Sequence, residues 1–257
     1  MKKVFLLIII ILCSNFIFGQ VDNVVSAQEV LQNRGEVYFK FFLEEDELTQ
    51  NNISFLSNII SIDNIKENEI TAYANTKGFS KFVDLNIDFE VLTPPSMLDS
   101  SILISASTTR NTEELDYYPS YDEYLNMMNQ FATDYPNLCE VVNIGYSING
   151  RELLFIHIND SLGIAQNEPE FMYTSSIHGD ELVGYFLMLR YIDHLLENYG
   201  VDPEITNLVN SIDIWINPLA NPDGTFAGGN NTVWGATRYN ANNVDMNRNY
   251  ADPEDGP

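Results

Sequence analysis

The chain has 257 residues, of which 45% are apolar, and a formal net charge of −25 at pH 7. This length accommodates one large domain, or a large domain with a small one, around a sizeable core. Only 12 Lys and Arg residues oppose 37 Asp and Glu residues. So few cations cannot neutralise a phosphate backbone, which excludes nucleic acid as an expected partner and favours a solvated acidic surface.

Residues 1–19 have the features of a secretory signal peptide. Lys2 and Lys3 precede a short apolar run, and the small residue Gly19 ends the segment. The run is too short for a spanning helix. We therefore expect a secreted or periplasmic protein with no stable membrane insertion after signal removal. Cys139 is then the only cysteine, so no internal disulfide is expected.

Residues 20–92 predict a small α+β domain. The pattern is strand, helix, strands, helix and strand, which favours a ferredoxin-like unit. The expected elements are a strand at 36–42, a helix at 47–60, a strand at 69–74, a helix at 76–85 and a strand at 87–92. Residues 93–118 begin with two prolines and continue with a Ser- and Thr-rich stretch, which predicts a linker.

Residues 119–257 predict a larger α/β domain. Long apolar-striped helices alternate with strands, so we expect a mixed, largely parallel sheet with flanking helices and one hairpin turn at Asn149-Gly150. The expected elements are helices at 121–135 and 182–199 and strands at 140–145, 153–158, 170–177 and 212–216. The apolar start of the 170–177 segment indicates a buried strand.

His178 and Glu181 lie where the chain leaves a predicted strand and enters a predicted helix. An imidazole and a carboxylate three residues apart on such a turn can reach one metal ion, and zinc accepts N and O ligands. The same spacing occurs at His194 and Glu197, inside a helix, where a partly buried His beside a solvated Glu is the expected structure. We also expect His157, within a strand, to pack rather than to bind metal.

Two arginines occur ten residues apart near the end of the chain. Arg248, beside Asn247, suits bidentate capture of a carboxylate. Arg238 can polarise a carbonyl and hold its oxyanion, and Asp245 can accept a hydrogen bond from the far nitrogen of a metal-bound His178. The alternative is that the arginines only offset nearby carboxylates on an acidic surface.

Together these segments resemble the zinc metallocarboxypeptidase family, the carboxypeptidase A/B/E-like enzymes, from about Pro119 to the end of the chain. The motifs in order are Gly150-Arg151, His178-Gly179-Asp180-Glu181, Asn221-Pro222-Asp223-Gly224 and Asp245-Met246-Asn247-Arg248. The resemblance implies one zinc ion, held by His178 and Glu181, with Asp245 orienting His178. It also implies that Arg238 contacts the scissile carbonyl and oxyanion, and that Asn247 and Arg248 bind the terminal carboxylate of a peptide or protein.

Two further expectations follow from the resemblance. The segment before the enzyme looks like the activation domain that precedes many such enzymes. The family's third zinc ligand and general-base glutamate fall beyond Pro257, so we expect the chain to be the amino-terminal part of a longer enzyme. Two alternatives stay open: an amidohydrolase similar to the N-acyl amino acid deacylases, and a non-catalytic peptide-binding homologue.

Overall fold

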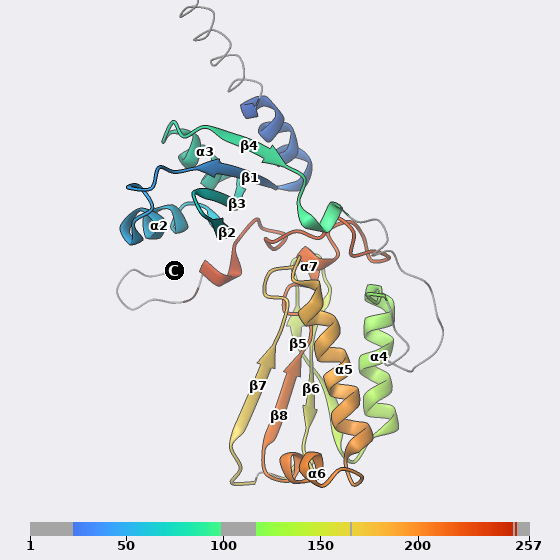
Figure 1. Cartoon of the computed structure of the whole chain (residues 1–257). Helices are drawn as coiled ribbons and strands as arrows, with labels where there is room; N and C mark the ends of the chain where they lie inside the picture. The colour runs from blue at the N-terminus through green and yellow to red at the C-terminus, as the bar shows by residue number, and fades with distance from the viewer. Residues whose placement is uncertain (1–22, 99–116, 165, 249, 251–257) are drawn as a thin grey trace, which may run out of the picture. The chain divides into compact units, whose positions relative to one another are not determined.

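The computed structural model describes most of the chain: residues 23–98, 117–164, 166–248 and 250. The chain divides into two compact units, Met1–Pro94 and Pro95–Pro257, each with its own sheet and hydrophobic core (Figure 1). The predicted signal peptide and most of the predicted linker lie outside the described residues. Within the described residues, no helix combines the length and apolar character that a membrane crossing requires.

The first unit is a four-stranded antiparallel sheet in the order β2-β3-β1-β4. Its elements are a helix at 23–34, β1 (Glu36–Phe42), α2 (Gln50–Ser57), β2 (Ser61–Lys66), β3 (Glu69–Asn75), α3 (Thr76–Val83) and β4 (Phe89–Leu92). This order and connectivity confirm the expected ferredoxin-like unit. The sequence did not predict β2, whose residues are mostly polar and exposed, nor the helix at 23–34.

The second unit is built on a sheet in the order β5-β6-β8-β7. Its longer elements are α4 (Tyr121–Asp134), β5 (Cys139–Tyr146), β6 (Glu152–Ile158), β7 (Glu170–Thr174), α5 (Leu182–Asn198), α6 (Pro203–Val209) and β8 (Asp213–Asn217). The expected mixed sheet with flanking helices is confirmed. Among the described strands, however, only β7 and β8 pair in parallel, while β5–β6 and β6–β8 are antiparallel.

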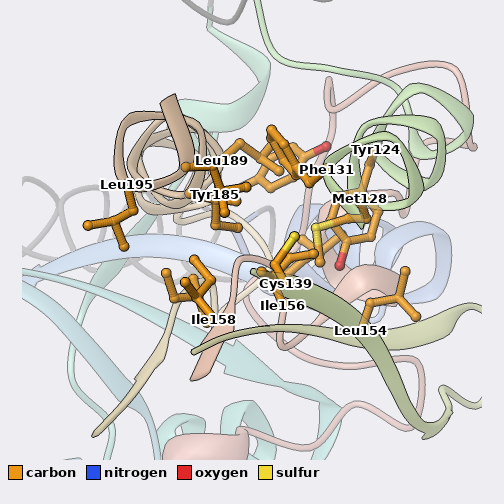
Figure 2. Close-up of a cluster of buried hydrophobic side chains, with 14 of the residues drawn as sticks. Tyr124, Met128, Phe131, Cys139, Leu154, Ile156, Ile158, Tyr185, Leu189 and Leu195 are labelled. Atoms are coloured by element: carbon orange, nitrogen blue, oxygen red, sulfur yellow. The ribbon is translucent and has the colours of Figure 1, made fainter. Parts of the chain in front are cut away.

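The helices α4 and α5 lie along one face of this sheet (Figure 1). A capping box fixes the start of α4, because the Ser120 side chain accepts from the Glu123 backbone and the Glu123 side chain accepts from the Ser120 backbone. Tyr124 of α4 and Tyr185 of α5 meet edge to face, with ring centroids 5.7 Å apart. Figure 2 shows both helices directing side chains onto the alternating apolar residues of β6: Leu154, Ile156 and Ile158.

The expectation of a buried strand near residue 170 was wrong. All five residues of β7 are exposed, and the side chains of Phe171 and Met172 are 49% and 61% exposed. The reason is position: β7 stands at one end of the described strand order and pairs only with β8 among the described strands. An apolar run alone does not distinguish a strand at the centre of a sheet from a strand at its edge.

Because β7 and β8 are parallel, the loops that follow them begin at the same edge of the sheet. The Ser175 amide donates to Asn217 O at 3.0 Å, and the Ala220 amide donates back to Ser175 O at 2.9 Å. The Asn221 amide then donates to Ser176 O at 3.0 Å. Loops beyond the carboxyl ends of parallel strands are the usual place for ligand sites in α/β sheets. The loop after β7 carries His178.

Candidate metal centre and substrate clamp

His178 lies between two carboxylates. Its Nδ1 is 2.6 Å from Glu181 Oε1, and its Nε2 is 3.1 Å from Asp245 Oδ1. The imidazole is buried, whereas the Glu181 side chain is 49% exposed. The structure therefore brings together three predicted residues, one of them 67 positions further along the chain. Each ring nitrogen faces its own acceptor, which fixes the plane of the ring.

The two carboxylates control the protonation of His178. Burial lowers its pKa, but the hydrogen bonds that the imidazole donates to Asp245 and Glu181 outweigh burial and raise the pKa to about 9. The same contact with His178 lowers the pKa of Glu181. A metal ligand must be deprotonated, so metal binding at His178 Nδ1 competes with a proton at neutral pH.

Arg238 shares the carboxylate that orients His178. Its Nε donates to Asp245 Oδ2 at 3.3 Å, and the Arg238 residue is only 9% exposed. Asp245 is itself buried, so the pair is shielded from solvent. Charge-assisted hydrogen bonds are the strong ones in such surroundings. One buried aspartate thus holds both the imidazole and the guanidinium.

Asn247 and Arg248 follow directly in the short helix η4 (Met246–Arg248). The Asn247 amide donates to Asp245 Oδ1 at 2.9 Å, and the Arg248 amide donates to Asp245 O at 3.0 Å. Both side chains are exposed, and Arg248 Nη1 donates to Asn247 O at 3.1 Å. The backbone of the predicted clamp is therefore fixed to the aspartate that orients His178.

The donor chemistry at His178 and Glu181 fits zinc. Zinc binds imidazole nitrogen and carboxylate oxygen, and a hydrogen-bonded partner on the second imidazole nitrogen is a recurrent feature of zinc-bound His. Catalytic zinc sites use three protein ligands. Within the described residues, no group of three or more His, Cys, Asp and Glu side chains is arranged to hold a metal ion. The described residues therefore bring two candidate ligands together, His178 and Glu181.

The other two histidines lie away from this site. His157 stacks on Trp215, with ring centroids 4.1 Å apart, and its ring nitrogens contact Glu140 and Asp213. This agrees with the expected packing role. His194 was expected to be partly buried but is exposed on α5, because it lies on the solvent side of the helix.

The sequence assigned no role to the turn α7 (Pro222–Thr225) and its flanking Asn221, although it singled out the Asn-Pro-Asp-Gly motif. Thr225 Oγ1 donates to Gly179 O at 2.8 Å. A Cβ on Gly179 would lie 2.2 Å from the backbone carbon of Gly224, so the two loops touch backbone to backbone. Two glycines in otherwise separate motifs were the available signal for this contact.

Comparison with known proteins identifies the family. The family model for zinc carboxypeptidases matches residues 124–256. Carboxypeptidase D of Mus musculus is 40% identical over 140 residues, which are 53% of this chain and 10% of that protein. The zinc carboxypeptidase of Saccharothrix mutabilis subsp. capreolus is 35% identical over 139 residues, 52% of this chain and 32% of that protein. The chain thus spans at most about a third of the length of these relatives.

Solved structures agree on the fold. Carboxypeptidase A from Helicoverpa armigera has a TM-score of 0.57 at 20% identity, covering 84% of this chain and 58% of that one. Thrombin activatable fibrinolysis inhibitor has a TM-score of 0.50 at 19% identity, covering 80% and 54%. At these identities the likeness shows the fold alone. Because the family model matches residues 124–256, more than half of the chain, this chain belongs to the zinc carboxypeptidase family.

Proposed function

We propose that the protein is a secreted, zinc-dependent carboxypeptidase that removes residues from the C-termini of peptides or proteins, with one zinc ion. The observation that carries the proposal is the single buried carboxylate of Asp245, which contacts both His178 and Arg238. A proposed metal ligand and a proposed carbonyl-binding cation thus share one buried carboxylate, which supports a reaction in which a peptide carbonyl is polarised beside the metal.

His178 and Glu181 are the proposed zinc ligands supplied by this part of the chain. Asp245 accepts from His178 Nε2, so Nδ1, which faces Glu181, would be the nitrogen that binds the metal once it has lost its proton. Glu181, half exposed, can bind the metal while remaining open to solvent. When bound, zinc would supply Lewis-acid chemistry, polarising a carbonyl and activating water near neutral pH.

Arg238 is the proposed contact for the scissile carbonyl. Its Nε is engaged by Asp245, which fixes the plane of the guanidinium. A guanidinium has five donors in a rigid fork, so the same group can donate to a carbonyl oxygen from its terminal nitrogens. The interaction strengthens as negative charge develops on that oxygen, so Arg238 would act mainly on the catalytic rate.

Asn247 and Arg248 are the proposed clamp for the free terminal carboxylate of the substrate. Both side chains are accessible, and their backbone is tied to Asp245. A planar guanidinium matches a carboxylate with two parallel hydrogen bonds. A clamp at this point would fix the position of a peptide's last residue relative to the metal and Arg238. Cleavage would then be restricted to the terminal bond.

Export, to the periplasm or the exterior, is proposed from the signal-peptide features of residues 1–19, and residues 20–92 are proposed as an activation-like domain. A deacylase-like amidohydrolase and a non-catalytic binding homologue are the alternatives that the experiment must distinguish. The whole small unit and the α4–β5–β6 segment precede the His178 motif, which supports the peptidase because deacylases of that kind begin close to their metal motif.

The clamp provides the test. The protein, expressed from its complete reading frame, is assayed on one peptide with a free C-terminal carboxylate and on the same peptide amidated. Arg248→Ala should lower kcat/KM for the free peptide by roughly 30-fold, about 2 kcal/mol, at the lower end for a charge pair because Arg248 is exposed. The amidated peptide should be cleaved poorly by both forms.

The matched control is Arg190→Ala, which removes another exposed arginine from α5. It should leave the free-carboxylate peptide unaffected. Equal losses for Arg248→Ala on both peptides would contradict the clamp. Hydrolysis of N-acyl amino acids in preference to peptides would favour the deacylase alternative, and peptide binding without turnover would favour the binding homologue.

A further inference from the structure

Asn221 connects two parts of the proposed site, the loop that carries His178 and the backbone of Arg238. Its side chain is 2% exposed. Its Oδ1 accepts from the Gly224 amide at 3.0 Å, and its Nδ2 donates to the backbone carbonyl of Arg238 at 3.3 Å. Reversing the amide would place oxygen against a carbonyl and NH2 against an amide N–H. The two contacts therefore define one orientation of the side chain.

The Arg238 carbonyl is also held by the loop that carries the zinc ligands. The Gly179 amide, next to His178, donates to Arg238 O at 3.3 Å. Asn221 reaches the same loop through its own backbone, because its amide donates to Ser176 O at 3.0 Å. Asn221 is thus bonded on one side to the loop of His178 and on the other to the backbone of Arg238.

The turn that follows Asn221 has little room to shift. A Cβ on Gly224 would lie 2.6 Å from Asn221 Nδ2 and 2.8 Å from each of two carbonyl oxygens, Thr237 O and Tyr239 O. On its other side, Asp223 is fixed to the β5–β6 hairpin, since Oδ1 accepts from Arg151 Nη1 and Ser147 Oγ at 2.8 Å each. The turn is therefore a rigid support for Asn221.

We propose that Asn221 is a positioning residue that sets the distance between Arg238 and the loop carrying His178 and Glu181. The donation to Arg238 O fixes the backbone from which the guanidinium extends, while the turn fixes Asn221 itself. This rests on the proposed function, because it assumes that Arg238 stabilises charge developing near the metal. Asn221 contacts no reacting atom and acts through Arg238.

Two substitutions remove the donation to Arg238 O while keeping an acceptor for the Gly224 amide. Asn221→Asp keeps an oxygen for the Gly224 amide and loses the donor to Arg238 O. Asn221→Ser keeps a hydroxyl that can cap the same amide but is too short to reach that carbonyl. The matched control is Asn217→Asp, because Asn217 is also buried and its Nδ2 donates to a carbonyl, Leu154 O, at 2.7 Å, within the sheet.

The first measurement is steady-state kinetics on a free-carboxylate peptide. Both Asn221 variants should lower kcat about tenfold or more relative to Asn217→Asp, with KM within about twofold and zinc content equal to wild type. In an Arg238→Ala background, Asn221→Asp should lower kcat no further, because the two residues act as one unit. An equal loss for Asn217→Asp, or an undiminished loss in the Arg238→Ala background, would overturn the proposal.

The second measurement needs no activity and separates this proposal from the proposed function. Amide hydrogen exchange should accelerate about tenfold at residues 176–181 and 236–239 in both Asn221 variants, and not in Asn217→Asp. Unchanged exchange at these two segments would overturn the positioning role even in an active enzyme. If the wild-type protein releases no C-terminal residue while both Asn221 variants still exchange faster at these segments, the proposed function is refuted and the structural coupling of Asn221 is retained.

Discussion

The contact between Gly179 and Gly224 allows a strong prediction from a single methyl group. In Gly179→Ala the added Cβ would lie 2.2 Å from Gly224 C and 2.4 Å from both Gly224 Cα and Thr225 N. All three atoms are backbone, so no side-chain rotation relieves the overlap. The loop of His178 must move away from α7, and both hydrogen bonds of Gly179, to Arg238 O and from Thr225 Oγ1, must lengthen.

The loss of folding stability expected for Gly179→Ala is the sum of the overpacking cost and the cost of the weakened hydrogen bonds. Overpacking a well-packed site costs about 1–3 kcal/mol, and each lost hydrogen bond adds about 1 kcal/mol. We expect a loss of about 3 kcal/mol. At about 2–4 °C per kcal/mol for a domain of 150–250 residues, the melting temperature should fall by about 6–12 °C. Zinc retention should fall as well, because His178 is the neighbouring residue.

Gly184→Ala is the matched control on the adjoining helix. Its added Cβ would meet Ser175 Oγ at 2.2 Å, which is the end of a side chain that can rotate, while the next atom lies at 3.5 Å. Alanine also favours the helix by about 1 kcal/mol over glycine. We expect Gly184→Ala to melt at or above the wild-type temperature, measured by circular dichroism. Equal melting temperatures for the two variants would refute the loop-contact argument.

Three further outcomes are expected. Asp245→Asn should weaken zinc binding about 10- to 100-fold in a chelator competition, because it removes the charge that orients His178; unchanged affinity would contradict that role. Cys139 should react with a thiol reagent at pH 8 only after unfolding, since burial raises its pKa to about 12; rapid labelling of the native protein would show that the thiol is accessible. Limited proteolysis should cut first between residues 93 and 118, where the sequence predicts a linker; a first cut inside α4 or α5 would argue against it.

Strong periodicity made the helices and central strands predictable. The apolar stripe of α4 and the Ser120–Glu123 capping box define that helix from local sequence, and the buried residues of β6 alternate as those of a half-buried strand should. The Asn149-Gly150 turn was predictable from its residue types, because this turn needs a positive φ and Gly150 adopts a φ of 79°. Local chemistry decides each of these elements.

Elements that depend on distant partners were less predictable. β2 is a mostly polar segment that becomes a strand because β3 offers a pairing edge. The exposure of β7 depends on which strands lie beside it, which its own residues do not reveal. The short helix α6 is capped by the preceding residue, Asp202, whose side chain accepts from the Glu204 and Ile205 amides; this cap becomes clear only once the helix is known.

The residues of the candidate site also fall into a predictable group and an unpredictable group. His178, Glu181, Arg238 and Asp245 were identified because their side-chain chemistry suits a metal, a carbonyl or an imidazole. Asn221 and Thr225 were assigned no role because their partners are backbone carbonyls, which every residue has. Residue type therefore predicted the groups proposed to meet the substrate, while the groups that hold the loops in place emerged only from the folded chain.

The most direct test of the account is to determine which bond the protein hydrolyses, and whether hydrolysis needs zinc. The protein from its complete reading frame is incubated with a free-carboxylate peptide, and products are followed by mass spectrometry before chelation, after chelation and after zinc is restored. We predict stepwise loss of single residues from the C-terminal end, abolished by the chelator, recovered with zinc and absent in His178→Ala. Internal cleavage, or terminal cleavage that His178→Ala retains, would contradict the account.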